Sequence, residues 1–137
     1  MSDAAVEARF QTCVKDAANF SRDVLKFLEK RTEAQQAKWA QESVEAGRVL
    51  FQPWSMEILF VLAVARDARF GELQKMLGGI SSRTLSDKLQ TLREEGLVER
   101  QVFDEQPVRI EYKLTHEGRV TAALATPLFA QLNHRLS

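Results

Sequence analysis

The sequence is short of the residues that mark secreted, membrane-spanning or disordered proteins. Its single cysteine, Cys13, excludes an internal disulfide, and such sparing use of cysteine is typical of a reducing cytoplasm. The apolar run at residues 59–65 ends at Arg66 and Asp67, well short of the roughly 18 residues of a membrane-spanning helix. The first residues lack the basic and apolar stretches of a secretory signal. Three prolines and six glycines leave little room for linkers, so we expect one folded cytoplasmic chain.

An excess of charge of either sign is also missing. The chain has 19 basic and 19 acidic residues, and its formal net charge is zero. Proteins that coat DNA without regard to sequence are strongly basic, because phosphate neutralisation dominates non-specific affinity. The equal numbers of basic and acidic residues argue against such a protein. They are compatible with a sequence-specific DNA-binding protein that has a local basic face.

The patterns that catalysis and metal binding require are absent too. The sequence has no nucleophile elbow, no glycine-rich loop after a strand and no paired catalytic carboxylates. His116 and His134 are isolated from each other and from any cluster of ligands, so we expect neither a metal site nor a cofactor. The chain is predicted not to be an enzyme.

What the sequence does have is a long amphipathic segment at its start. Apolar residues from Val6 to Phe27 follow one another at alternating steps of four and three, which predicts one helix over residues 4–31. A single helix cannot bury such a stripe alone, so we expect a homodimer in which the last helix also takes part. The predicted dimer interface consists of Val6, Phe10, Cys13, Ala17, Phe20, Val24, Phe27, Leu124 and Leu128.

Cys13 lies within this apolar stripe. A small buried thiol explains that position better than a reactive redox sensor does, and burial is the prediction. The phenylalanines of the stripe likewise fit helix packing better than an effector pocket. An unknown small-molecule effector nevertheless stays open as a partner.

Cap and turn signals divide the middle of the chain. A capping box, Thr32 with Gln35, predicts a second helix that ends near residue 50 and is either separate from the first helix or continuous with it. A nearly all-apolar helix is expected from Pro53 to about residue 65. A short strand at 68–70 and a helix at 71–77 follow.

Glycines and hydroxyl residues delimit the second half of the chain. A tight turn at residues 78–79 precedes a helix that we expect between the N-cap Ser81 and the terminating Gly96. Strands at 97–103 and 109–114 form a predicted hairpin. A last helix follows Thr115, and Pro127 is where we expect it to be kinked or interrupted.

Two short helices joined by a tight turn, with a hairpin directly after the second, indicate a winged helix-turn-helix. The predicted fold is therefore mainly α with a small β-hairpin, flanked by N-terminal and C-terminal dimerisation helices. We divide it into a helical dimerisation extension (1–50), the winged helix-turn-helix domain (51–115) and a C-terminal dimerisation helix (116–137).

The helix after Ser81 is the expected reader of DNA. Leu85, Leu89 and Leu92 anchor one face to the core, so the opposite face would enter the major groove. Arg83 is the candidate for a guanine edge, and the helix N-terminus suits a phosphate. The predicted DNA contacts are Ser81, Ser82, Arg83, Thr84, Ser86, Asp87, Lys88 and Gln90 on the helix, with Arg100 and Arg109 on the wing.

Four segments resemble the HxlR-type regulators. They are RFGEL at 69–73, GISSRTLS at 79–86, GLVER at 96–100 and PVRIEYKLT at 107–115, the last ending at Gly118. The 107–115 segment is the most specific, because the related MarR family usually has a different wing. The resemblance covers residues from about 40 to 130. It implies a homodimeric bacterial or archaeal transcription regulator that reads a palindromic operator.

Two departures from the family pattern limit which family properties the resemblance implies for this chain. The family's Gly-Gly-Lys-Trp segment reads FQPW at residues 51–54, and the cysteine of its redox-sensing members has no counterpart near residues 40–41. The thiol-sensor property is therefore not implied for Cys13. The helix at 4–31 also looks like an addition to the usual family chain, and we expect it to extend the dimer interface.

Together these patterns predict a sequence-specific regulator of transcription whose partners are double-stranded DNA and a second copy of itself. The alternative is a winged-helix module that binds protein through the same face. The zero net charge keeps that alternative open.

Overall fold

The computed structural model describes residues 2–136 and divides the chain into two compact units. One unit contains the long helix α1 (Asp3–Glu29), the helix α2 (Glu33–Ala46) and the part of α6 from Pro127 onward. The other unit spans Gly47–Thr126. No helix in the described part of the chain combines the length and apolar character that crossing a bilayer needs.

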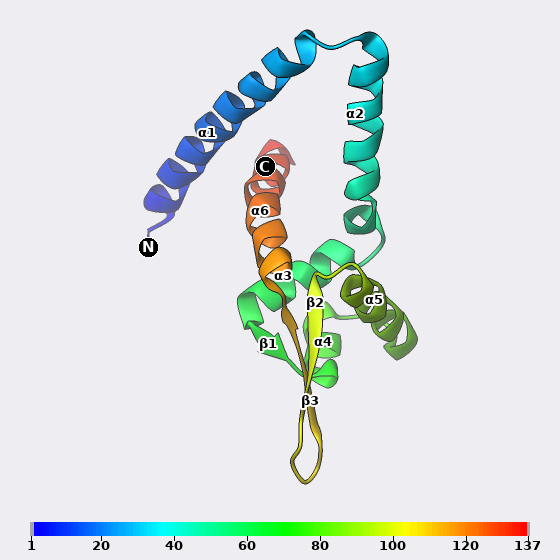
Figure 1. The fold of residues 1–137 in the computed structure, drawn as a ribbon. Coiled ribbons are helices and arrows are strands. Elements are labelled where there is room, and N and C mark those ends of the chain that lie inside the picture. The colour runs from blue at the N-terminus through cyan, green and yellow to red at the C-terminus, as the bar shows by residue number, and fades with distance from the viewer. Residues whose placement is uncertain (1, 137) are drawn as a thin grey trace. The chain divides into compact units, whose positions relative to one another are not determined.

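The second unit carries the elements that the sequence assigned to DNA binding (Figure 1). In chain order they are a short 3-10 helix η1 (Arg48–Phe51), α3 (Ser55–Ala65), β1 (Asp67–Ala68), α4 (Phe70–Leu77), α5 (Ser82–Glu94), β2 (Val98–Phe103), β3 (Arg109–Leu114) and the start of α6 (His116–Leu136). The mainly helical fold with a small sheet is confirmed.

The three strands form one antiparallel sheet in the order β1-β3-β2. β2 and β3 pair along their whole length, from Val98 opposite Leu114 to Phe103 opposite Arg109, and their hairpin extends beyond the helices (Figure 1). β1 pairs only with Lys113 and Tyr112, so the outer part of β3 has no second strand beside it among the described residues. The hairpin is thus a wing held to the body at its base.

The core lies between the helices and the base of the sheet. α3 contributes Ile58, Leu59 and Leu62, all essentially inaccessible to solvent, whereas Val64 of the same helix is 81% exposed. The remaining core side chains come from the other elements of this unit and include Leu73, Leu85, Leu89, Leu92, Val98 and Leu114.

The capping box at Thr32 is confirmed and separates α1 from α2. The Gln35 amide N–H donates to Thr32 Oγ1 at 3.2 Å, and the Thr32 amide N–H donates to Gln35 Oε1 at 3.0 Å. α2 ends at Ala46 rather than near residue 50, because the chain passes through Gly47 into the 3-10 turn of η1.

Three other expected boundaries move by a few residues. α3 begins at Ser55 rather than Pro53, since Trp54 is in the left-handed region with φ 72° and cannot belong to a right-handed helix. The short strand is Asp67–Ala68 rather than 68–70, and α4 already begins at Phe70. α6 runs through Pro127 without interruption.

The apolar stripe of α1 is exposed over most of its length. Phe20 is 71% exposed and Phe27 58%, whereas Leu28 is the only buried residue of the helix. Cys13 is exposed on the single chain as well, so its expected burial in a dimer interface stays a prediction. All residues from 11 to 20 are exposed.

Candidate DNA-binding surface

The start of α5 is fixed by a hydroxyl cap and two glycines. Ser81 Oγ accepts a hydrogen bond from the Thr84 amide at 3.1 Å, as an N-cap does, and donates to Thr84 Oγ1 at 2.9 Å. Gly78 and Gly79 supply the positive φ angles, 51° and 78°, that the turn before the cap requires. The predicted N-cap and turn are both confirmed.

A glutamine of α4 ties the two helices together across this turn. Gln74 Nε2 donates to Ser82 Oγ at 3.0 Å and to the Ile80 carbonyl oxygen at 3.4 Å. These bonds link α4 to the start of α5 and leave the Ser82 hydroxyl free to donate a hydrogen bond. Sequence reasoning missed Gln74, because a polar residue on a short helix gives no signal of what lies opposite it in space.

The face of α5 opposite its buried leucines is open to solvent. Arg83, Ser86 and Asp87 are exposed there, and Arg83 has neither an ion-pair nor a hydrogen-bond partner among residues 2–136. Thr84 and Lys88 lie on the flanks and are half-buried. The predicted separation of an anchoring face from a polar face is therefore present in the structure.

Some predicted contact residues on α5 already have partners within the chain. Lys88 Nζ lies 3.3 Å from Gln52 Oε1. Gln90 is exposed and bridges its neighbours: its Nε2 donates to Glu94 at 3.0 Å, and its Oε1 accepts from Arg93 at 3.1 Å. A ligand that used either side chain would have to compete with these bonds, all of which are solvent-accessible.

The two wing arginines lie on opposite faces of the hairpin. Arg100 stands opposite Tyr112 and shares its face with Val98, whereas Arg109 stands opposite Phe103. Arg100 is exposed and has no partner within the described chain. The structure therefore does not bring the two predicted wing contacts together on one surface.

Arg109 is surrounded by groups that neutralise and shield it. Its guanidinium lies 3.2 Å from Glu105 and 3.5 Å from Glu111, and it stacks over the Phe103 ring at 4.0 Å from the centroid. Only 30% of its side chain is exposed. These contacts give Arg109 a role in holding the tip of the wing together.

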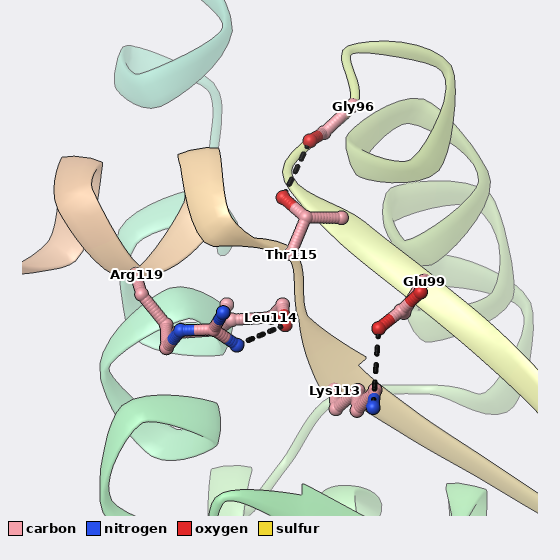
Figure 2. A network of polar contacts seen from close by, with 6 residues as sticks. All are labelled: Gly96, Glu99, Lys113, Leu114, Thr115 and Arg119. Carbon is pink, nitrogen blue, oxygen red and sulfur yellow. Dashed lines mark hydrogen bonds and ion pairs between the residues drawn. The ribbon is translucent and has the colours of Figure 1, made fainter.

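Thr115 joins the wing to the helix behind it (Figure 2). Its Oγ1 donates to the Gly96 carbonyl oxygen at 2.6 Å and accepts from the Gly118 amide at 3.0 Å, which confirms the predicted N-cap of α6. Its own amide donates to the Leu97 carbonyl oxygen at 3.0 Å. A Cβ at Gly118 would collide with that same Leu97 carbonyl, so α6 lies directly against the start of β2.

Within residues 2–136, no group of three or more His, Cys, Asp or Glu side chains is placed so that it could hold a metal ion. The surface described above consists instead of one exposed helix face, its capped N-terminus and an adjacent hairpin. Two helices joined by a glycine turn, with a hairpin directly after the second, define a winged helix-turn-helix protein.

Comparison with known proteins narrows this class to a family. The family described as HxlR-like helix-turn-helix matches residues 49–134, and the chain belongs to it. YvaP of Bacillus subtilis, an HTH-type transcriptional regulator, is 41% identical over 76 residues, which are 56% of this chain and 69% of that protein. BH0655 of Halalkalibacterium halodurans, another such regulator, is 40% identical over 47% of this chain and 58% of its own length.

A solved structure agrees with the sequence relatives. The reduced form of the transcriptional regulator YodB from B. subtilis superposes with a TM-score of 0.55 at 30% identity, over 66% of this chain and 83% of that one. Sequence matches cover about three fifths to two thirds of the first relatives' length. The relatives are transcriptional regulators of the helix-turn-helix type, and α1 lies outside the family match.

Proposed function

We propose that the protein is a transcriptional regulator that binds a palindromic double-stranded DNA operator as a homodimer. The observation that carries this proposal is the exposed polar face of α5, a helix anchored by Leu85, Leu89 and Leu92 next to a hairpin wing. A helix of this width fits the major groove, where base edges present distinct donor and acceptor patterns. Membership in a family of helix-turn-helix regulators supports the same function.

In this proposal the residues of the surface have different roles. Arg83, exposed and unpaired, is assigned to a base edge, where an arginine can form two hydrogen bonds with guanine. The free amides in the first turn of α5 are assigned to a phosphate. Arg100 is the better candidate for a wing contact, because Arg109 is already matched by Glu105 and Glu111.

The homodimer is part of the proposal. The exposed stripe of α1 and the exposed Leu124 and Leu128 of α6 are apolar surfaces that a second copy of the chain would cover. We assign residues 1–50 and 116–137 to dimerisation and residues 51–115 to DNA. A two-fold dimer presents two copies of α5, which is why the operator should be palindromic.

Selection of bound duplexes from a random DNA pool tests the proposal. The expected result is an enriched palindrome whose half-sites lie roughly one or two helical turns apart, centre to centre. Titration of the selected duplex against a scrambled one should show a specific affinity that falls with salt, as phosphate contacts require. Enrichment of no sequence would contradict a sequence-specific reader.

A second function, binding to another protein through the same face, is favoured by one observation. The net charge is zero, and two carboxylates neutralise Arg109 on the wing. A module of that kind should show almost no affinity for random duplex DNA at any salt concentration. A steep loss of duplex binding between low and moderate salt would instead support the regulator.

A further inference from the structure

A cavity of about 310 Å³ lies at the base of the wing, where α3 ends and α6 begins. Leu62 and Ala63 of α3 supply its apolar wall, while Arg66, Lys113 and Arg119 bring charged groups to it. We name it the α3–α6 cavity. Its volume lies at the lower end of the range for small-molecule sites, roughly 300–1,000 Å³.

The charges around this cavity do not cancel. Lys113 is paired with Glu99 at 3.3 Å, so that lysine is already neutralised (Figure 2). Asp67 supplies one further carboxylate, against the two guanidinium groups of Arg66 and Arg119. Three cations and two carboxylates leave a surplus of one positive charge, which suits an anion carrying a single charge.

Both arginines keep donors available for such an anion. Arg119 Nη1 donates to the Leu114 carbonyl oxygen at 3.1 Å, which uses only one part of a guanidinium with five N–H donors (Figure 2). Arg66 has no ion-pair or side-chain hydrogen-bond partner in the described residues. Guanidinium groups bind carboxylate and phosphate in a two-pronged geometry, and both arginines are exposed and therefore open to a ligand from solvent.

The backbone at Arg66 gives an independent indication. Its φ of 69° lies in the region that glycine occupies without strain and that other residues rarely adopt. Here the position at the end of α3 carries an arginine, whose side chain lines the cavity. Strained non-glycine residues of this kind cluster at ligand-binding sites.

The cavity is separate from the proposed DNA-binding surface. β1 and β2 form opposite edges of the sheet, with α5 packed on β2, whereas Asp67 of β1 lines the cavity. DNA bound along α5 would therefore approach the other edge. Arg66 and Arg119 can therefore serve a different ligand.

We propose that the α3–α6 cavity binds a small organic anion. Its single carboxylate or phosphate group lies between Arg66 and Arg119, and its compact apolar body lies against Leu62 and Ala63. Binding links the end of α3 to the first turn of α6, with the wing strand β3 between them. The site does not depend on the proposed DNA-binding function, and its test needs no DNA.

Titration of the full-length protein with benzoate, followed by backbone amide NMR, tests this site. The expected result is saturable shifts at residues 62–67 and 113–119, which the uncharged analogue benzamide does not produce. Arg66→Gln and Arg119→Gln should each weaken benzoate binding about tenfold, the usual effect of removing one charge-assisted hydrogen bond. The matched control Arg22→Gln, on α1, should leave it unchanged. Ala63→Trp should block binding without altering any charge.

Further results distinguish a carboxylate ligand from a phosphate ligand and from the phosphates of DNA. Inorganic phosphate that produces the same shifts, with the same sensitivity to Arg66→Gln, supports the site with a phosphate head group. If neither anion gives saturable shifts, or if the arginine variants bind benzoate like the wild type, the proposal is wrong. It is equally overturned if Arg66→Gln and Arg119→Gln weaken only duplex DNA binding, because these cations would then serve DNA phosphates.

Discussion

At the scale of single residues, Arg83 is the side chain that we expect to determine which DNA sequence the protein recognises. It is exposed, lacks a partner and projects from the first turns of α5, away from the core leucines. Arg83→Ala should cost roughly 1–3 kcal/mol on the selected operator and relax the preference at one base pair per half-site. Its melting temperature should match that of the wild type, because no packing is lost. Equal operator binding by the variant and the wild type would remove α5 from the DNA interface.

Arg109 and Arg100 provide a matched pair on the wing. Arg109→Ala removes two ion pairs and a cation–π contact, so we expect a loss of about 1 kcal/mol in the free energy of unfolding. Arg100→Ala removes an unpaired exposed side chain and should leave stability unchanged. If a wing arginine contacts phosphate, its alanine variant reduces by about one unit the magnitude of the slope of the logarithm of the DNA-binding constant against the logarithm of the salt concentration. Chemical denaturation and salt titrations of both variants measure the two effects separately.

Some features of the candidate site can be predicted from the sequence, and others cannot. Ser81 and the leucine stripe of α5 were predictable, because N-caps and helical periodicity depend only on neighbours along the chain. The bond between Gln74 and Ser82 was not, and neither was the shielding of Arg109 by Glu105 across the hairpin tip. The first contact depends on how α4 packs against the start of α5, and the second depends on the conformation of the hairpin tip, where Glu105 and Arg109 are four residues apart.

At the scale of elements, the difference between local signals and tertiary packing explains which predicted boundaries agree with the structure. Thr32 and Gly96 delimit helices through local hydrogen bonding or a local φ, and both signals were visible in the sequence. Trp54 and Arg66, which flank α3, adopt positive φ angles although neither residue type favours them. Because of the φ of Trp54, α3 begins at Ser55, two residues after the predicted start at Pro53. Tertiary packing imposes such angles, and the cost is recovered elsewhere in the fold.

The junction between the wing and α6 gives a prediction at this scale. Thr115→Ala removes the N-cap of α6 and the bond to Gly96, so it should lower the free energy of unfolding by about 1–2 kcal/mol. Gly118→Ala should cost a comparable amount, about 1–3 kcal/mol, because its Cβ cannot fit against the Leu97 carbonyl. Urea denaturation measures both variants.

Thr126→Ala is the control for this junction, since the Thr126 hydroxyl bonds only to Ala122 within the same helix. A hydroxyl of that kind contributes little to a helix interior. The control should therefore stay within about 0.5 kcal/mol of the wild type. If Thr115→Ala behaves like the control, the cap does not couple the wing to α6.

At the scale of the whole molecule, we propose that the exposed stripe of α1 determines assembly. The intact protein should be a dimer at micromolar concentration, and deletion of residues 1–31 should weaken the dimer or cause aggregation. Phe20→Glu should do the same with a single change, because a carboxylate in an apolar interface is costly to desolvate. Sedimentation velocity over a concentration series is the measurement.

Gln11→Glu makes the same change of charge on the opposite face of α1 and should leave assembly unaltered. A monomeric wild type would contradict the dimer. An unchanged assembly of the Phe20→Glu variant would place the interface elsewhere.

The two-residue length of β1 has a consequence for solubility. Between Tyr112 and the tip of the wing, β3 has no strand paired to it on one side among residues 2–136, and an unpaired strand edge is a template with which other chains can pair. Arg109 and Glu111 lie along this edge, and Pro107 stands just before it. Charges and prolines at strand edges oppose growth of an intermolecular sheet. With a net charge of zero, the molecule has little overall repulsion to keep its copies apart, so we expect these few residues to be the main obstacle to pairing of wings from different molecules.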